Sequence, residues 1–237
     1  MTKNSGSVNA MLNIKNFGNF FCFKSFRNIS LRPIMREKII QKATDLFLKL
    51  GFKSVTMDDI ANEMAISKKT IYTHFKNKTA LVKDCTFCVM DSITSGIDEI
   101  CALDQNPIEE LFEIKKFILR KLEDDQSSPQ YQLQKYYPEI SKKLHQNQFE
   151  KMMECTRKNM IKGIEQGLYR SNLDPDFIAR LYFLGIHGIK DQSLFPKDRF
   201  PAKFVTEEYL EYHLRGIVTP EGFKTLKKFI KEHQTND

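Results

Sequence analysis

The sequence predicts an all-α chain, in which a small N-terminal group of three helices precedes a larger helical region. Apolar residues recur at spacings of three and four along most of the 237 residues, which is the periodicity of amphipathic helices. The alternating apolar and polar pattern of a half-buried strand is absent. Most of the eight prolines stand where a helix would begin. A chain of this length can bury a sizeable core, as one large or two small domains.

Residues 1–34 differ from the rest in composition. They hold five basic and no acidic side chains, several phenylalanines and no long periodic pattern. Met35 then stands directly before a strongly periodic segment, so we expect residues 1–34 to be a misassigned or disordered extension. Two alternatives stay open, namely a basic arm that touches nucleic acid and a targeting or membrane-surface segment. No apolar run reaches the 18 residues of a membrane-spanning helix, so no membrane partner is expected.

The first helix is expected over Met35–Leu50. One apolar stripe runs along it, formed by Ile39, Ile40, Ala43, Leu46, Phe47 and Leu50. Gly51 is expected to end this helix, because glycine readily takes the left-handed conformation of a C-terminal cap.

Residues 56–78 are expected to form two short helices joined by a tight turn. Thr56 is a good N-cap for the first of them, and Asp59 completes a capping box three positions later. Ala65-Ile66 make the turn, and Ser67 caps the second helix. This arrangement is a helix-turn-helix, whose second helix is suited to the major groove of DNA.

The two helices of this motif separate an inner from an outer face. The inner face is expected to hold Ile60, Ala61, Met64, Ile71 and Phe75. The outer face of the second helix carries Lys68, Lys69, Thr70, Tyr72, Thr73 and His74. Lysine is unfavourable beside the positive end of a helix dipole, so a phosphate or base partner best explains the lysine pair.

The remaining chain is expected to be helical between caps and prolines. Helices are expected from Asn77 onward, over Pro107–Asp125, from Pro129, and over Pro138–Gly167, Pro175–Gln192, Thr206–Arg215 and Pro220–Lys231.

The net charge of +7 is unevenly distributed. Residues 1–34 and 35–83 each carry +5, whereas residues 84–237 carry −3. The positive excess therefore lies in the N-terminal third, as expected if that part meets phosphates.

Cysteine and histidine patterns favour neither catalysis nor metal binding. The five cysteines form no dense framework, which indicates reduced thiols in a cytoplasmic compartment. Cys85-x-x-Cys88 lacks the second ligand pair of a zinc site and is expected to be core, with redox sensing by Cys85, Cys88 or Cys101 as an alternative. The histidines have no recognisable nucleophile or metal partner, so no enzyme activity and no cofactor is expected.

The helix-turn-helix and the residues around it resemble a known family. Gly51, Thr56, Ile60-Ala61, the run 66–72 and the run 74–78 resemble the N-terminal signature of the TetR/AcrR family of transcriptional regulators. The resemblance implies a DNA-binding domain over residues 35–80 and a helical ligand-binding and dimerisation domain over residues 81–237. Ala65 departs from the family pattern, since glycine commonly occupies the turn. Alanine there costs on the order of 1 kcal/mol if the backbone is left-handed.

The resemblance also implies where partners bind. Contacts with double-stranded operator DNA are expected from Thr56, Ser67, Lys68, Lys69, Thr70, Tyr72, Thr73, His74 and Lys78. A pocket for an unknown small-molecule effector is expected among Phe112, Tyr131, Tyr136, Phe149, Met152, Met153, Tyr182, Phe183 and His187. A homodimer interface is expected to include Leu181, Gly185, Gly188, Tyr209 and Tyr212. For Gly185 and Gly188 the sequence itself adds a reason, because glycine inside a helix permits close approach of a neighbouring helix.

The sequence therefore predicts a homodimeric, cytoplasmic, ligand-responsive transcriptional regulator, and most simply a repressor. The alternative is an interaction or architectural protein that uses the same DNA-binding motif without sensing a small molecule. A solidly packed C-terminal core would favour that alternative, and a connected apolar cavity would favour the sensor.

Overall fold

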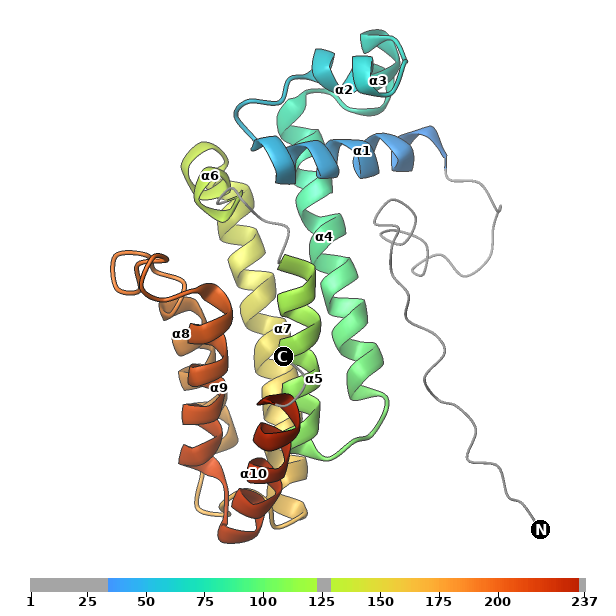
Figure 1. Cartoon of the computed structure of the whole chain (residues 1–237). Coiled ribbons are helices and arrows are strands. Elements are labelled where there is room, and N and C mark those ends of the chain that lie inside the picture. Colours follow the sequence, from blue (N-terminus) through green and yellow to red (C-terminus); the bar gives the residue numbers. More distant parts are fainter. Residues whose placement is uncertain (1–33, 123–128, 235–237) are drawn as a thin grey trace, which may run out of the picture.

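The computed structural model describes residues 34–122 and 129–234, and every regular element in these ranges is an α-helix (Figure 1). The helices are α1 Met35–Leu50, α2 Met57–Glu63, α3 Lys68–His74, α4 Lys78–Cys101, α5 Pro107–Leu122, α6 Pro129–Tyr136, α7 Pro138–Glu165, α8 Pro175–Gly188, α9 Ala202–Ile217 and α10 Pro220–Gln234. The expected all-α fold is confirmed. The extension predicted over residues 1–34 lies, apart from Ile34, outside the described residues.

Most helix starts agree with the predictions, and the clearest correction concerns α9. This helix begins at Ala202 rather than at Thr206, with Pro201 as the residue before its first turn. The Thr206 hydroxyl donates to the Ala202 carbonyl at 2.7 Å, as a threonine inside a helix does, so it caps nothing. At the other end α9 extends to Ile217, beyond the predicted Arg215, and α8 stops at Gly188 instead of Gln192.

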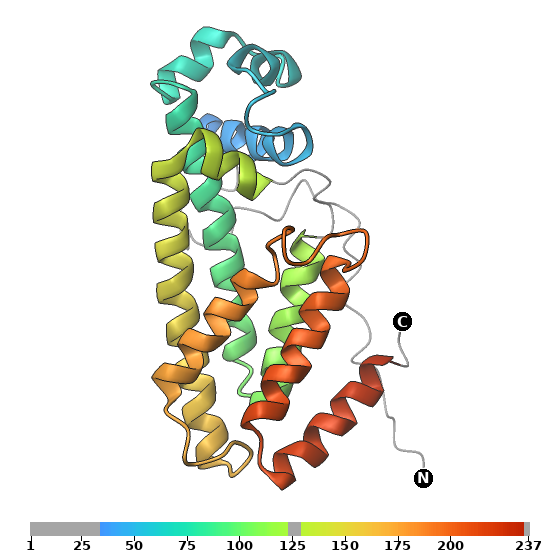
Figure 2. The same cartoon turned by 90° about the vertical axis from the view of Figure 1, so that its left-hand side faces the viewer.

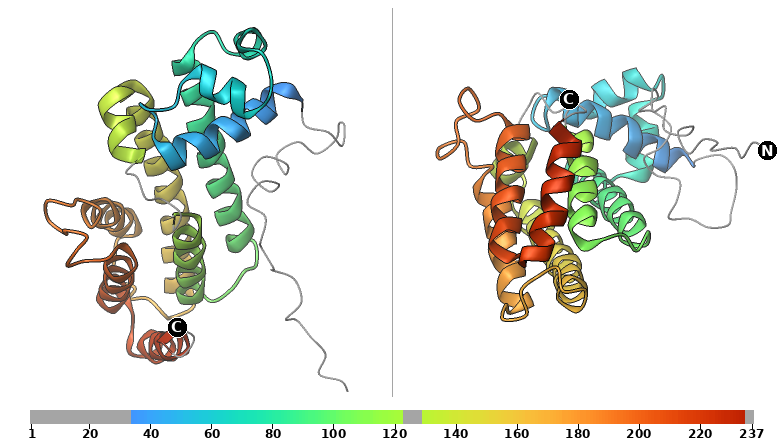
Figure 3. Two further views of the ribbon diagram at one scale, coloured as in Figure 1. Left: turned by 45° about the horizontal axis from the view of Figure 1, so that its top comes forward. Right: turned by 60° about the horizontal axis from the view of Figure 1, so that its bottom comes forward.

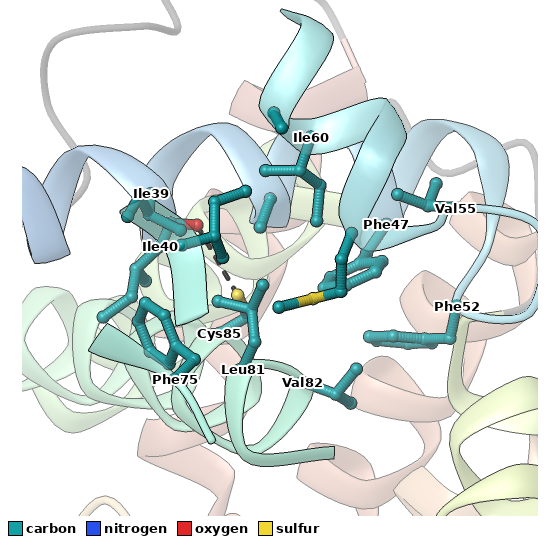
Figure 4. Close-up of a cluster of buried hydrophobic side chains, with 14 of the residues drawn as sticks. Ile39, Ile40, Phe47, Phe52, Val55, Ile60, Phe75, Leu81, Val82 and Cys85 are labelled. Atoms are coloured by element: carbon teal, nitrogen blue, oxygen red, sulfur yellow. Dashed lines mark hydrogen bonds between the residues drawn. The ribbon is translucent and has the colours of Figure 1, made fainter. Parts of the chain in front are cut away.

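The first three helices and the start of α4 enclose one apolar core (Figure 4). Fully buried side chains from each helix meet there, among them Ile39, Phe47, Ile60, Ile71 and Leu81. Cys85 of α4 lies in the same core, where its thiol donates to the Ile40 carbonyl at 3.5 Å. Burial raises the pKa of the Cys85 thiol to about 12, so this cysteine is an inert core residue, as expected.

This N-terminal core is not closed by residues 35–80 alone. Leu133 of α6 and Ile140 of α7 are buried in it. The Phe52 ring meets the Tyr137 ring edge-on, with 6.2 Å between the centroids. The Gln132 side chain accepts from the Lys53 backbone N–H at 3.3 Å. The N-terminal helices are therefore held by α6 and α7 as well as by α4.

The long helices α4, α5 and α7 form the body below the N-terminal helices, with α8 and α9 along the edge opposite α4 (Figures 2 and 3). A second core fills this body and includes Ile108, Met160, Leu210, Leu214 and Leu226, each at most 1% exposed. None of the described helices is long and apolar enough to cross a membrane.

A buried polar network lies inside this second core. The Asn159 amide donates to the Glu110 carboxylate at 2.8 Å and to the Pro107 carbonyl at 2.9 Å, and it accepts from the Tyr169 hydroxyl at 3.0 Å. Because each of these groups finds a partner, the network joins α5 to α7 without the cost of an unpaired buried polar atom.

Candidate nucleic-acid interface

The helix-turn-helix is fixed by hydrogen bonds at its helix starts. The Thr56 hydroxyl accepts from the Asp59 N–H at 3.1 Å, and the Asp59 carboxylate accepts from the Thr56 N–H at 2.8 Å. This confirms the predicted capping box. These bonds from the Thr56 backbone and side chain hold the pKa of Asp59 below its usual value. Ser67 caps α3 as predicted, accepting from the Thr70 N–H at 3.0 Å.

The turn between α2 and α3 has the backbone that Ala65 tolerates least. Ala65 has a φ of 51°, in the left-handed region that favours glycine. The conformation lets the Ile66 N–H donate to the Ala61 carbonyl at 3.0 Å and brings Ser67 to the start of α3. The strained backbone of Ala65 therefore sets the angle between α2 and α3.

Replacing Ala65 by glycine is expected to stabilise the fold by about 1 kcal/mol, because glycine adopts this backbone without strain. Thermal and urea unfolding of the full chain measure the effect. The matched control is Ala80→Gly in the regular backbone of α4, which is expected to destabilise by up to about 1 kcal/mol. A free energy of unfolding that is lower for Ala65→Gly than for the unsubstituted chain would show that the backbone at position 65 is not strained.

The second helix of the motif presents a polar face away from the core. Ile71 and Phe75 are 0% and 2% exposed, whereas Tyr72 between them on the other face is 45% exposed. Lys69, Thr73 and His74 are likewise exposed, and Thr70 is half-buried. The division into two faces agrees with the prediction. Two of the hydroxyls are engaged within α3, since Ser67 contacts the Thr70 hydroxyl at 2.8 Å and Thr73 donates to the Thr70 carbonyl at 2.7 Å.

Lys68 has a partner that the sequence analysis did not predict. Its ammonium pairs with the Asp58 carboxylate of α2 at 2.8 Å, and this hydrogen bond raises the pKa of Lys68. The lysine therefore has a protein partner at the positive end of α3 and does not need a phosphate there. Lys69 is also exposed, and Lys68 must leave Asp58 to reach DNA.

Thr56 and Lys78 lie at opposite ends of the motif. Lys78 is half-buried, with its ammonium 3.4 Å from the Lys53 carbonyl oxygen and 5.9 Å from the centre of the Phe47 ring. Burial lowers the pKa of Lys78, against the opposing effect of the Asp59 carboxylate. Lys78 therefore connects the start of α4 to Phe47 of α1 and to Lys53, and this role is separate from a contact with a phosphate.

The residues predicted to line one pocket lie on four helices, and the structure brings some of them together. Tyr131 and Tyr136 of α6 are 59% and 39% exposed, beside the Lys135 ammonium. Phe112 is buried on α5, stacked on the Phe229 ring of α10. The others belong to α7 and α8, and a compact aromatic group forms there from Phe149, Phe183, His187 and His145. Phe112, Met152 and Tyr182 also pack together in the second core, whereas Tyr131 and Tyr136 are exposed on α6.

A cavity of about 170 Å³ lies elsewhere, between α4, α5 and α7, and its lining is polar. It is lined by Asp98, Cys101, Asp104, Glu110, Lys151, Glu154, Cys155, Lys158, Asn159 and Lys162. None of the predicted pocket residues, Met152 and Met153 included, is among them. Sequence reasoning missed this set because residues near position 100 meet residues near position 155 only through the packing of α4 on α7.

The residues predicted for a dimer interface separate into inner and outer positions. A Cβ on Gly185 would collide with the Tyr209 hydroxyl, which donates to the Leu181 carbonyl at 3.2 Å. Gly185 and Tyr209 thus permit close approach of α8 and α9 within one chain. Leu181 and Tyr212 are 44% and 76% exposed on the outer side of the same two helices. An added Cβ on Gly188 would meet nothing within 4 Å in this chain, so no helix of the same chain requires glycine there.

Comparisons with known proteins agree with this geometry. Residues 39–85 match the family described as bacterial regulatory proteins, tetR family. The repressor KstR2 of Mycolicibacterium smegmatis is 24% identical over 197 residues, covering 80% of this chain and 93% of the relative. The biofilm operon regulator IcaR of Staphylococcus aureus is 32% identical over 94 residues, covering 36% of this chain and 50% of the relative.

Solved structures extend the likeness to the fold of most of the chain. A putative transcriptional regulator from Saccharomonospora viridis, solved in complex with choline, has a TM-score of 0.62 and 20% identity. The alignment covers 78% of this chain and 97% of that one. The likeness therefore includes the helical body as well as the helix-turn-helix.

Proposed function

The chain belongs to the TetR family of bacterial regulatory proteins, and from this premise we propose that it represses transcription as a homodimer that a small-molecule ligand releases from operator DNA. The observation that carries the proposal is the exposed face of α3, with Lys69, Tyr72, Thr73 and His74 outside and Ile71 and Phe75 buried. A rigid helix that presents basic, hydroxyl and aromatic side chains has the chemistry needed to contact phosphates and base edges in the major groove.

The chemistry of each position suggests a role in this contact. Lys69 neutralises phosphate charge, which releases counterions and makes binding sensitive to salt. Tyr72 is suited to a thymine methyl group or a phosphate oxygen. Thr56, at the start of α2, and Lys78, at the start of α4, flank α3 and are suited to the DNA backbone on either side.

Dimerisation is supported by an exposed apolar face on α8 and α9. Phe177, Leu181 and Leu184 lie along one side of α8 and are 59%, 44% and 68% exposed, and Tyr212 of α9 is 76% exposed. Contiguous apolar residues of this size favour an interface over solvent. Two copies joined there would place two α3 helices on half-sites about one helical turn apart, roughly 34–36 Å, on a near-palindromic operator.

Ligand response requires a physical route from the body to α3. The helix α4 starts four residues after α3 ends, and its far end lies against the polar cavity. A second route runs through Leu133 and Ile140, which belong to α6 and α7 but are buried in the N-terminal core. A ligand that shifts α4 or α7 would thereby alter the spacing of the two α3 helices. The choline found in the related regulator makes a small polar ligand a reasonable first class to test here.

Footprinting on DNA from the region upstream of the protein's own gene is the experiment that tests the proposal. We expect protection of two half-sites with two-fold symmetry by a dimer, and affinity that falls steeply with salt. Compounds selected for raising the melting temperature are then titrated into the complex. A true effector must weaken DNA binding by the same factor by which DNA weakens effector binding. Protection without symmetry, or stabilising compounds that leave DNA affinity unchanged, would contradict the proposal.

The alternative of a DNA-binding protein without a sensor has one observation in its favour. The cavity between α4, α5 and α7 is small, and none of the expected apolar pocket residues lines it. If no compound changes operator affinity while two half-sites are protected, the architectural role is favoured.

A further inference from the structure

Two cysteines far apart in the sequence meet where α4 ends against α7. Cys101 is the last residue of α4, and Cys155 lies in the middle of α7. Both side chains line the cavity between the two helices, and each thiol shifts the pKa of the other. Each of the two cysteines is half-buried, whereas Cys85 is buried in the N-terminal core. None of the four cysteines in the described ranges forms a disulfide.

Ion pairs hold the two helices together on both sides of the thiols. Before them Lys151 of α7 pairs with Asp98 of α4 at 2.5 Å. After them Lys162 pairs with Asp104 at 2.7 Å. The first pair joins the two helices and the second joins α7 to the loop after α4, and α4 and α7 run parallel (Figure 2). The geometry keeps the two thiols together and disfavours separation.

The surroundings favour a thiolate at one of the two positions. The hydrogen bond with Cys101 lowers the pKa of the Cys155 thiol, and the Lys151 ammonium lowers it further. Burial and the carboxylates of Asp98 and Glu154 act in the opposite direction. The same hydrogen bond raises the pKa of Cys101, together with burial. Because Lys151 lies one turn before Cys155 on the same helix, Cys155 is the position where a thiolate is favoured, and Cys101 is its protonated partner.

Oxidants of small size can reach this place from solvent. Lys158 and Asp104 are exposed members of the cavity lining, with side chains 74% and 89% exposed. The charged and polar side chains that line the cavity suit a polar oxidant such as a hydroperoxide. The aromatic group of α7 and α8 does not offer such a lining.

We propose that Cys101 and Cys155 are a redox-active pair that a hydroperoxide converts to an intramolecular disulfide between α4 and α7. The Cys155 thiolate attacks the peroxide, the O–O bond breaks, and a sulfenic acid forms on Cys155 while the leaving oxygen takes a proton. Cys101 sulfur then attacks the Cys155 sulfur, the S–O bond breaks, and water leaves with the Cys101 proton. Two thiols are oxidised and one hydroperoxide is reduced to water and, for an organic peroxide, an alcohol.

The disulfide would fix the far end of the helix that begins next to α3. This modification goes beyond the proposed ligand response, and its chemistry does not depend on DNA binding. A failure of the disulfide test is therefore distinct from a failure of the footprinting experiment.

The test uses the reduced full chain, treated with hydrogen peroxide, quenched by alkylation, digested and mapped by mass spectrometry. We expect a Cys101–Cys155 linked peptide on a monomer in a non-reducing gel, and a melting temperature several degrees higher than that of the reduced chain. Both effects should reverse with dithiothreitol. Unlinked Cys101 and Cys155 at peroxide levels that oxidise other cysteines, or their linkage only between chains, would overturn the proposal.

Variants assign the two roles and provide matched controls. In Cys101→Ala the sulfenic acid on Cys155 cannot be resolved, so dimedone should label Cys155. In Cys155→Ala, dimedone labelling of Cys101 at the rate seen for Cys155 would overturn the assignment. Lys151→Gln should slow the peroxide reaction roughly threefold or more, because the thiolate loses its nearby cation. Lys142→Gln removes the same charge from an exposed position of α7 more than three turns from Cys155 and outside the cavity, and it should leave the rate unchanged; circular dichroism confirms that each variant is folded.

Discussion

Replacing Lys69 and Tyr72 together by alanine is expected to lower operator affinity by roughly a hundredfold or more. Both side chains are exposed on α3, and neither contributes to the core formed by Ile71 and Phe75. The loss of one phosphate contact and one groove contact costs about 1–3 kcal/mol each, and each 1.4 kcal/mol is a factor of ten. The melting temperature should change little, since the substituted side chains are solvent-exposed.

Fluorescence anisotropy with operator and scrambled DNA at several salt concentrations separates the two contributions. Lys69→Ala alone should weaken binding to both DNAs and reduce the salt slope by about one, if it contacts a phosphate. Tyr72→Ala should weaken binding to the operator more than to scrambled DNA. Lys83→Ala, at an exposed position of α4, removes the same charge outside the motif and is the control. Equal losses for Lys83→Ala and Lys69→Ala would indicate a general charge effect and contradict a specific role for α3.

Two glycines near the end of the chain should respond in opposite ways to the same substitution. Gly222 lies in the first turn of α10, where a Cβ would collide with the Leu168 carbonyl oxygen and lie 3.1 Å from the Val218 Cβ. That carbonyl cannot easily move, because it accepts from the Thr219 N–H at 2.9 Å. We expect Gly222→Ala to cost about 2–3 kcal/mol and to lower the melting temperature by roughly 5–10 °C.

Gly216, in α9, is the matched control for this prediction. It is exposed, and a Cβ there would meet nothing within 4 Å. Alanine is the better helix former, so Gly216→Ala should stabilise the protein by up to about 1 kcal/mol. Differential scanning calorimetry of both variants measures the contrast. Destabilisation by both substitutions, or by neither, would show that the contact between α10 and Leu168 is not what requires glycine at position 222.

Local features of the chain were predictable from the sequence because they depend on residues close together. The start of α1 at Met35, the capping box of Thr56 and Asp59, the Ser67 cap and the proline starts of α5 to α8 each involve a few neighbouring positions. The left-handed turn at Ala65 was predictable for the same reason. The two faces of α3 followed from helical periodicity alone.

Features that join distant segments were not predictable in this way. The partner of Lys68 is ten residues away, on α2, and the predicted phosphate was assigned without knowledge of Asp58. The aromatic and methionine residues suggested for one pocket share a chemical type, but Tyr131 and Tyr136 are exposed on α6 while Phe112 and Tyr182 are buried in the second core. Periodicity identifies which side of a helix is buried, and it carries no information about which other helix buries it.

By itself the sequence determined the all-α class, the helix-turn-helix and its exposed face, because periodicity and capping act within a few residues. Only the tertiary structure decided that α6 and α7 complete the N-terminal core, that Gly185 faces Tyr209 within one chain, and that Cys101 meets Cys155. Those contacts depend on how whole helices pack, and helix packing is determined jointly by side chains that are tens of residues apart.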